Sequence, residues 1–280
     1  MHLYPNAKIN LGLNIVGRRD DGYHDIETVF YPIPLNDVLT AEVAGAFAFS
    51  QTGAALDCPP ADNLVVKAIR RYADMSATTP AAPAPMPPLS IVLHKRIPAG
   101  AGLGGGSSDA AAAVRAMRSL LHLTDSDAAL EAMLAPLGAD CPFFVRNVPV
   151  FATGIGNVFT PISLSLAGWG IALVKPDIHV ATREAYAAVR PARPAMPLTD
   201  IVRRPPGQWQ HLLTNDFEPS VFAAHPRIGD IKQRLIGLGA TYASMSGSGS
   251  AVYGLFAPGK PVPHLADAFP DSFTWTGQLT

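Results

Sequence analysis

A glycine-packed loop that runs straight into an alanine-rich stretch, residues 98–112, constrains this chain more than any other feature. Glycine has no Cβ, so its backbone can adopt positive φ and let a polyanion approach successive N–H groups. Ser107, Ser108 or Asp109 can then cap a helix, whose positively polarised N-terminus would point at the same place. The loop predicts a phosphate-binding site at the start of a helix.

The loop does not have the Walker pattern, because Ser107 follows Gly106 with no lysine between them. Gly100, Gly102 and Gly105 satisfy the dinucleotide pattern G-x-G-x-x-G, which is weak alone. A dinucleotide fold would place this pattern in its first strand-to-helix turn, whereas here it lies a third of the way along the chain. Two alternatives stay open at this point: a dinucleotide site, and a glycine-rich helix start that binds nothing.

Composition narrows the class of protein. The 280 residues suffice for one large or two modest domains, and 48% are hydrophobic while 15% are charged. The 21 Lys and Arg residues nearly balance 22 Asp and Glu residues, so no global field favours nucleic acid or anionic membrane. Lys8 and Asn10 interrupt the first apolar run, and Cys58 and Cys141 are predicted to be reduced thiols. We expect a cytoplasmic protein, either monomer or homodimer.

Strands and helices alternate along the chain, which predicts an α/β (α+β) protein. In the first half we expect a hairpin of strands 7–16 and 26–33, a helix 63–74 capped by Asp62, a strand 89–93, a helix 126–137 stopped by Gly138 and a strand 148–152. After residue 156 we expect a strand 170–174, helices 182–189 and 228–238, and a strand pair across 246–250. The Pro- and Ala-rich tract 76–88 is predicted to be a loop. The predicted domains are 1–155 and 156–280.

Two isolated polar residues stand among apolar neighbours. Lys8 lies in the first strand, where its ammonium must reach solvent or find a carboxylate. An edge-strand lysine that guards against aggregation would explain it equally well. Asp140 could be a helix N-cap with Pro142 in the first turn. From these residues alone, a structural and a functional role stay open for both side chains.

Three segments together resemble the motifs of the GHMP kinases. They are the lysine-bearing strand at residues 7–11, the glycine-serine loop at 98–112, and the turn at 244–250. This resemblance implies a two-domain kinase fold, with an N-terminal ATP-binding domain like the second domain of ribosomal protein S5. The C-terminal GHMP kinase domain is then expected to be ferredoxin-like.

Further segments are similar to one branch of that family. They are residues 19–24, 62–64, 95–98, 138–143 and 154–156, and the Asp-Gly-Tyr-His run within 19–24 is the most discriminating. That branch uses ATP and Mg²⁺ to phosphorylate the C2 hydroxyl of a cytidine diphosphate-linked methylerythritol in the non-mevalonate route to isoprenoid precursors. The resemblance therefore implies a small-molecule substrate of this kind.

The resemblance also implies roles for individual residues. Asp140 matches the general base, and Lys8 matches the cation that holds that aspartate and the hydroxyl in line. ATP binding is expected at Asn63, Lys95, Pro98, Gly100, Gly102, Leu103, Gly104, Gly105, Gly106, Ser107 and Ser108, with Asn63 and Lys95 near the adenosine. Substrate binding is expected at Asn10, Tyr23, His24, Asp140, Thr182 and Tyr186. No protein metal ligands are assigned.

Substrate choice is expected to depend on His24, which would bind the cytosine edge, between Tyr23 and Tyr186 on the ring faces. Asp109 stands where some relatives have asparagine, which adds a negative charge that Mg²⁺ or the helix dipole would offset. Another GHMP kinase, such as homoserine or mevalonate kinase, would have no reason for the Gly22-Tyr23-His24 turn. A non-catalytic ligand-binding protein of the same fold would not need both Lys8 and Asp140.

Overall fold

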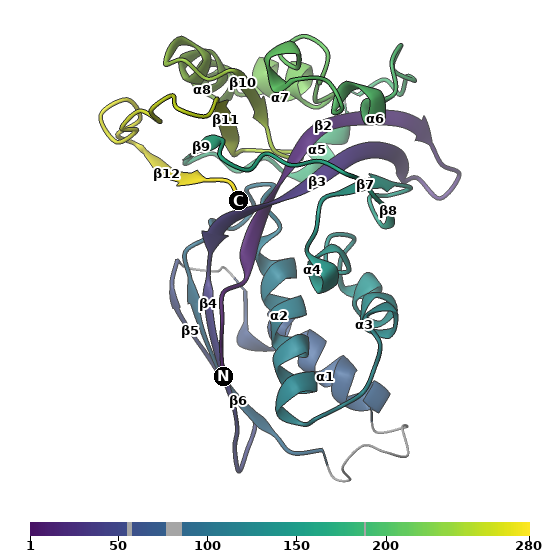
Figure 1. The fold of residues 1–280 in the computed structure, drawn as a ribbon. Helices are drawn as coiled ribbons and strands as arrows, with labels where there is room; N and C mark the ends of the chain where they lie inside the picture. The colour runs from purple at the N-terminus through teal and green to yellow at the C-terminus, as the bar shows by residue number, and fades with distance from the viewer. Residues whose placement is uncertain (55–57, 77–85, 188) are drawn as a thin grey trace. The chain divides into compact units, whose positions relative to one another are not determined.

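The computed structural model describes residues 1–54, 58–76, 86–187 and 189–280 (Figure 1). The chain forms two compact units. Unit 1 comprises Met1–Ala7, Leu35–Ala99 and Gly104–Val148, and unit 2 comprises Lys8–Pro34, Gly100–Leu103 and Pro149–Thr280. Both units are discontinuous in sequence, and the predicted division into 1–155 and 156–280 stays a prediction. Among the described residues, no helix combines the length and apolar character that a membrane span requires.

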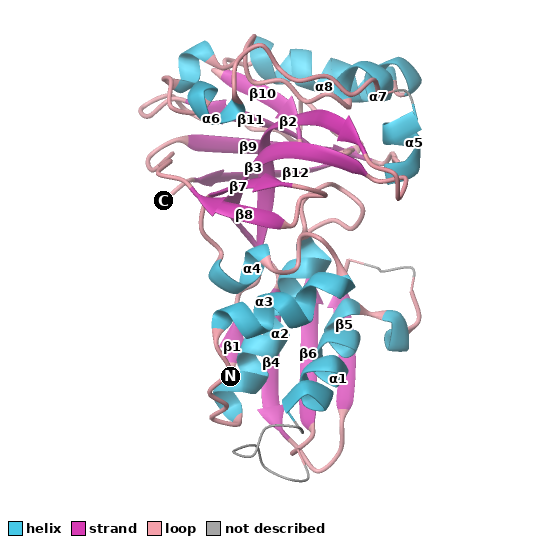
Figure 2. Ribbon diagram, turned by 90° about the vertical axis from the view of Figure 1, so that its right-hand side faces the viewer, coloured by secondary structure: helices cyan, strands magenta, loops and turns pink. Residues whose placement is uncertain are grey.

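Unit 1 is a four-stranded sheet covered on one face by helices, as Figure 2 shows. The strand order is β1 (His2–Leu3), β4 (Val38–Val43), β6 (Leu89–Lys95) and β5 (Ala48–Gly53). β5 runs parallel to β6, and the other pairs are antiparallel. The helices are α1 (Leu64–Ser76), α2 (Gly105–Leu120), α3 (Asp127–Leu134) and α4 (Phe143–Arg146).

Strand β6 shows why this sheet has one covered face. Ile91 and Leu93 are buried, whereas Val92 is 43% exposed, so apolar side chains on alternate positions face the helices. Helices α1 and α2 pack against each other, and each has buried apolar residues, among them Ala68 of α1 and Val114 of α2. The predicted strand at 89–93 is confirmed and extends to Lys95. β6 therefore brings the chain directly to the glycine loop.

Unit 2 contains two four-stranded sheets. One has the order β2 (Asn6–Arg18), β3 (His24–Asn36), β7 (Val150–Thr153) and β8 (Val158–Pro161). The other has the order β10 (Tyr242–Met245), β11 (Val252–Phe256), β9 (Gly170–Pro176) and β12 (Ser272–Gln278). The α-helices that the described part of this unit contains are α5 (Thr182–Ala187), α6 (Leu198–Ile201), α7 (Glu218–Ala224) and α8 (Pro226–Gly237). Residues of both sheets and of α5, α7 and α8 share one buried cluster, so the hairpin is part of this core.

The predicted hairpin and the strand pair across 246–250 are confirmed, because β2 neighbours β3 and β10 pairs antiparallel with β11. The predicted helix near 228–238 is present as α8. The predicted helix 182–189 is present as α5 over six residues, and residue 188 lies outside the described part. Most of the tract 76–88 also lies outside the described residues, which end at residue 76 and begin again at residue 86.

Helix termini differ from the sequence predictions. Asn63 caps α1 in place of Asp62, because its Oδ1 accepts a hydrogen bond from the Val65 N–H at 2.9 Å. Helix α3 ends at Leu134 rather than Leu137, and a 3-10 turn that contains Pro136 follows. Proline lacks the N–H that the next α-helical bond would require, so it ends the helix before Gly138 is reached.

The start of α2 also differs from prediction. Its N-cap is Gly104 at φ +70°, and no side chain accepts a hydrogen bond there. Ser107, Ser108 and Asp109 were predicted as caps but lie inside the helix, which begins at Gly105. A left-handed glycine turns the chain into the helix without a capping side chain, so the N–H groups of the first turn keep their capacity for another acceptor.

Candidate active site

The N-terminus of α2 is the first part of the candidate site, and it belongs to unit 1. Ser108 N–H already donates to Gly104 O, the first bond of the helical ladder. Gly106 is exposed, and a Cβ on it would lie an ordinary 3.5 Å from Leu64 Cδ1. Uncapped N–H groups at the positive end of a sixteen-residue helix form a surface that suits phosphate. The local geometry therefore fits the predicted phosphate site.

The preceding part of the loop lies in unit 2 against the turn that follows β10. Gly100 and Gly102 have φ values of +59° and +74°. A Cβ on Gly102 would overlap the carbonyl of Ser246, so only glycine fits there. Ser246 Oγ donates to Gly102 O at 2.8 Å and accepts from Asn10 N–H at 3.3 Å. One hydroxyl thus joins the glycine loop, the first strand and the serine turn.

Lys8 is buried in unit 2. Its side chain is directed away from solvent, with only 3% of the residue exposed. Its Nζ donates to Asn10 Oδ1 at 2.7 Å and lies 4.7 Å from the centroid of the Phe30 ring. Asn10 Nδ2 in turn donates to Thr28 Oγ1 at 3.0 Å, so β3 holds the amide that faces the lysine. The explanation of Lys8 as a solvent-exposed edge lysine is wrong.

Asp140 lies in a half-buried turn beside the first turn of α2, within unit 1. A Cβ on Gly138 would lie 3.3 Å from Cys141 Sγ and 3.8 Å from Ser107 Oγ. Burial raises the pKa of Cys141 to about 11, although a hydrogen bond with Ser107 acts in the opposite direction. Asp140 is not the cap of α4, because that helix starts after Pro142 without a capping side chain. The structure therefore places the predicted base close to the N-terminus of α2.

Asn63 and Lys95, both predicted near the adenosine, are buried in unit 1. Asn63 Nδ2 donates to Gln51 Oε1 at 3.3 Å, in addition to the capping bond of its Oδ1. Lys95 Nζ donates to Asp37 Oδ2 and to Asp109 Oδ2. Asp37 follows β3 with no motif around it, so no sequence signal indicated its role. The roles of Asn63 and Lys95 toward ATP stay predictions.

The residues predicted to recognise a base are only partly brought together. The rings of His24 and Tyr186 stack with centroids 4.8 Å apart and planes inclined by 21°. The ring of Phe217 contacts Tyr186 edge-on, with the ring centroids 4.8 Å apart. No sequence pattern indicated Phe217. Tyr23 is 61% exposed on the hairpin turn, and Thr182 is exposed at the start of α5. In this arrangement Tyr186 covers the histidine, so a sandwiched base would need these rings to separate.

Asn215, a third residue that no sequence pattern indicated, braces the serine turn of unit 2. Its Nδ2 donates to Met245 O and to Gly247 O, each at 2.9 Å, while its Oδ1 accepts from Phe217 N–H. The neighbouring Leu13 N–H donates to Thr214 O at 2.9 Å. No sequence pattern indicates the segment of Thr214 and Asn215, because its hydrogen-bond partners Met245 and Leu13 are far away in the sequence. It ties β2 to the turn that holds Gly102.

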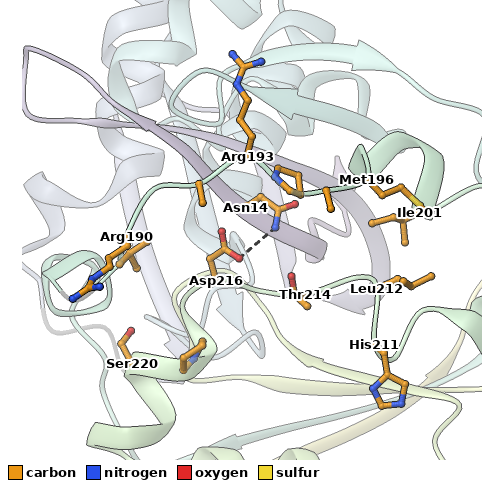
Figure 3. A pocket seen from close by; sticks show the side chains of 15 residues that line it. Asn14, Arg190, Arg193, Met196, Ile201, His211, Leu212, Thr214, Asp216 and Ser220 are labelled. Atoms are coloured by element: carbon orange, nitrogen blue, oxygen red, sulfur yellow. Dashed lines mark hydrogen bonds between the residues drawn. The ribbon is translucent and has the colours of Figure 1, made fainter.

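A cavity of about 600 Å³ lies elsewhere in unit 2 (Figure 3). Its polar centre is the pair Asn14 and Asp216, whose Nδ2 and Oδ1 are 3.3 Å apart. Asp216 Oδ2 also accepts from Ile15 N–H at 2.8 Å, so the carboxylate is already engaged by β2. Arg190 and Arg193 extend outward from its rim in different directions. None of the predicted site residues lines this cavity.

Comparisons with known proteins assign the class. Residues 63–147 match the GHMP kinases N terminal domain, and residues 198–274 match the GHMP kinases C terminal domain. The solved mevalonate kinase of Methanococcus jannaschii shares the fold, with a TM-score of 0.71 at 13% identity over 100% of this chain and 98% of that one. Together with the glycine loop at the start of α2, these matches define a two-domain kinase of the GHMP class. The alternative of a dinucleotide-binding fold is wrong.

Comparison with individual relatives identifies the family within this class. The 4-diphosphocytidyl-2-C-methyl-D-erythritol kinases of Parabacteroides distasonis and Bacteroides thetaiotaomicron are 49% and 48% identical, each over 100% of both chains. A crystal structure of 4-(cytidine 5'-diphospho)-2C-methyl-D-erythritol kinase has a TM-score of 0.85 and 32% identity, covering 100% of this chain and 99% of that one. This chain belongs to the family of 4-diphosphocytidyl-2-C-methyl-D-erythritol kinases.

The loop geometry leads to a first testable prediction. In Gly104→Val, a β-branched residue must take φ near +70°, which strains the start of α2. We expect the Kd of a non-hydrolysable ATP analogue, measured by calorimetry, to rise about tenfold or more. Gly237→Ala in α8 is the control, because a Cβ there meets nothing within 4 Å and the residue lies outside the loop. An unchanged Kd in a folded Gly104→Val protein would place the phosphates elsewhere.

Proposed function

We propose that this protein transfers the terminal phosphoryl group of ATP to the C2 hydroxyl of 4-diphosphocytidyl-2-C-methyl-D-erythritol. This step belongs to the non-mevalonate route to isoprenoid precursors. The observation that carries the proposal is the turn of Asp140 beside the uncapped start of α2, which supplies a base next to a phosphate site. The full-length relatives named for this reaction supply the identity of the alcohol.

The phosphate-binding role falls to the loop and the first turn of α2. ATP supplies the phosphoryl group, and the protein supplies position and compensating charge. The N–H groups of Gly105, Gly106 and Ser107 are proposed to donate to phosphate oxygens, aided by the positive end of the helix. Gly100 and Gly102 give the loop its curvature through positive φ.

Asp140 is proposed to accept the proton of the C2 hydroxyl. Its carboxyl group is only half-buried, so a substrate hydroxyl can reach it. Its neighbour Cys141 is no competing nucleophile, because burial keeps its pKa far above neutral pH. Asp140 therefore takes the role of general base.

Lys8 is proposed as the cation that orients this base and the substrate hydroxyl. Its burial and its bond to Asn10 hold the ammonium in one direction, whereas an exposed lysine would sample many rotamers. The Phe30 ring lies against the ammonium from one side. Asn10 is assigned to the substrate as well, since its amide is fixed between β3 and the lysine.

Mg²⁺ is proposed to enter with the ATP phosphates. Within the described ranges, no three His, Cys, Asp or Glu side chains gather into a ligand set. Mg²⁺ in phosphoryl-transfer sites keeps several waters and takes substrate phosphates plus one or two carboxylates as ligands, so a metal carried by the nucleotide requires no three-residue protein cage. The oligomeric state and the cytoplasmic location stay predictions.

Recognition of the cytosine is proposed for His24, Tyr23 and Tyr186. His24 and Tyr186 already stand together in unit 2, and Phe217 fixes the edge of the tyrosine. Tyr23 is exposed on a turn with Gly22 at φ +86°, where its ring is available to stack on a base. Binding energy from this remote base would align the reacting hydroxyl.

The second prediction tests this specificity. We expect turnover of the cytidine diphosphate-linked methylerythritol but none of free methylerythritol phosphate. His24→Ala should lower kcat/KM for the cytidylyl substrate roughly tenfold or more, because the cytosine edge then lacks its hydrogen-bond partner in a closed site. The KM for ATP should stay nearly constant.

Steady-state kinetics with both substrates provides the measurement. His211→Ala is the matched control, because His211 is an exposed histidine of the same unit. Equal activity with and without the nucleobase, or a His24→Ala defect confined to ATP, would contradict the assignment of this turn to cytosine.

A further inference from the structure

A buried charge cluster of Asp37, Lys95 and Asp109 lies beneath the start of α2 in unit 1. These three residues are 0%, 3% and 1% exposed. Lys95 Nζ donates to Asp37 and, at 2.7 Å, to Asp109 Oδ2. The inference drawn from this cluster rests on the proposed binding of ATP phosphates at α2.

The cluster joins the segments that shape the phosphate loop. Asp37 Oδ1 accepts hydrogen bonds from Arg96 N–H and Ile97 N–H, which fixes the exit of β6 toward the loop. A Cβ on Gly105 would lie 3.2 Å from Lys95 Nζ, so the ammonium touches the first residue of α2. Asp109 follows Gly105 by four residues, which is about one helical turn. The charges of the cluster therefore act directly on the start of α2.

The charges in this cluster are not balanced when both carboxylates are ionised. Two carboxylates then face one ammonium, and Asp109 Oδ1 is buried without a hydrogen-bond partner. Burial raises the pKa of Asp109 to about 7, with Lys95 lowering it and Asp37 raising it. Near neutral pH, Asp109 thus changes between its charged and neutral forms.

Lys95 and Asp37 exert the largest charge effects on Asp109. Asp140, in the turn beside the first turn of α2, is half-buried, and most of the other charged side chains on the neighbouring described elements are exposed. On α1, Lys67, Arg70, Arg71 and Asp74 are exposed, and Lys67 pairs with Asp62. Arg115 of α2, Arg146 of α4, His94 of β6 and Glu42 of β4 are also exposed. The titration of Asp109 is therefore governed by Lys95, Asp37 and whatever binds at the start of α2.

We propose that Asp109 is a proton-linked positioning residue of the phosphate site, which takes up a proton when ATP binds. Phosphate charge at the first turn of α2 would lie roughly 8–9 Å from the carboxyl, the sum of one helical turn of about 5.4 Å and a hydrogen bond of about 3 Å. At an effective dielectric constant of about 20, one such charge raises the pKa of an acid by about one unit. Protonation then neutralises the cluster, so the helix N-terminus presents its positive end without an opposing carboxylate.

Calorimetric titration with Mg-ATP at pH 8, in two buffers of different ionisation enthalpy, measures the proton uptake. The phosphate groups are fully ionised there, since their second pKa is about 6. For a pKa that rises from about 7 to about 8, uptake is about 0.4 proton per ATP. Adenosine, which carries no phosphate, should bind without uptake, and Asp109→Asn should show none with ATP.

Affinity gives an independent readout that a merely structural role would not move. Asparagine imitates the neutral acid, so Asp109→Asn should bind ATP about fivefold more tightly than the native protein at pH 8 and equally at pH 6. Asp74→Asn, an exposed aspartate on α1, is the matched control and should leave both values at the native level.

Native proton uptake of zero at pH 8, or an Asp109→Asn affinity at pH 8 equal to or weaker than the native one, would overturn the inference. The native uptake needs no variant, so the test survives if Asp109→Asn fails to fold. Failure of the proposed function gives other results: the native protein would not bind ATP, or the Gly104→Val variant would bind ATP with the native affinity.

Discussion

Asp140→Asn is expected to lower kcat by at least about 10²-fold while the Kd for ATP stays nearly constant. Asparagine keeps the shape of the side chain but cannot take the proton of the C2 hydroxyl, so only the chemical step is affected. The half-buried turn that holds Asp140 lies next to Ser107 and Cys141, and an isosteric change should not disturb it.

Single-turnover kinetics separates this loss from binding and product release. Asp62→Asn is a suitable control, because Asp62 belongs to the same unit and its side chain is 58% exposed. Thermal unfolding of each variant shows whether the fold is retained. Near-normal turnover in a folded Asp140→Asn protein would remove Asp140 from the mechanism. No turnover by the native protein would favour the non-catalytic alternative.

Lys8→Met is expected to lower kcat by a similar factor, at least about 10²-fold. Methionine has an apolar side chain of similar length but lacks the ammonium that donates to Asn10 and lies over the Phe30 ring. If this cation stabilises the ionised base and aligns the hydroxyl, the loss appears in kcat rather than in the KM for ATP.

The double variant Lys8→Met with Asp140→Asn tests whether the two residues act as a unit. Residues that share one catalytic step have non-additive effects, so the double variant should be little slower than either single one. Independent, multiplying losses would show that Lys8 serves the fold or another step. Lys260→Met, at an exposed lysine, is the control and should leave kcat unchanged.

Short-range patterns in the sequence predicted much of the fold and part of the candidate site. The hairpin of β2 and β3, the strand β6 before the glycine loop, and the strands on either side of Ser246 all follow from alternating apolar residues and turn residues. The positive φ of Gly100 and Gly102 likewise follows from a local steric rule that any glycine-rich turn obeys.

Local sequence rules did not predict the exact residues at which the helices begin and end. Ser107, Ser108 and Asp109 all have cap chemistry, but Gly104 begins the turn earlier and leaves them inside α2. Asp62 and Asn63 are equally good caps by residue type, and only the bond to Val65 N–H distinguishes them. A choice between adjacent residues depends on how the helix packs, which a local pattern does not contain.

Only the tertiary structure decided which polar groups meet. Asp37, Lys95 and Asp109 come from segments 58 and 14 residues apart and form one buried cluster. Asn215 donates a hydrogen bond to Gly247 O, 32 residues away in the sequence, and Phe217 at the start of α7 contacts the ring of Tyr186 in α5. The sequence by itself determined the phosphate loop and the kinds of residue beside it, because backbone sterics act between neighbours. The fold decided the partners and charge states of those residues, because burial and Coulomb interactions depend on distance in space.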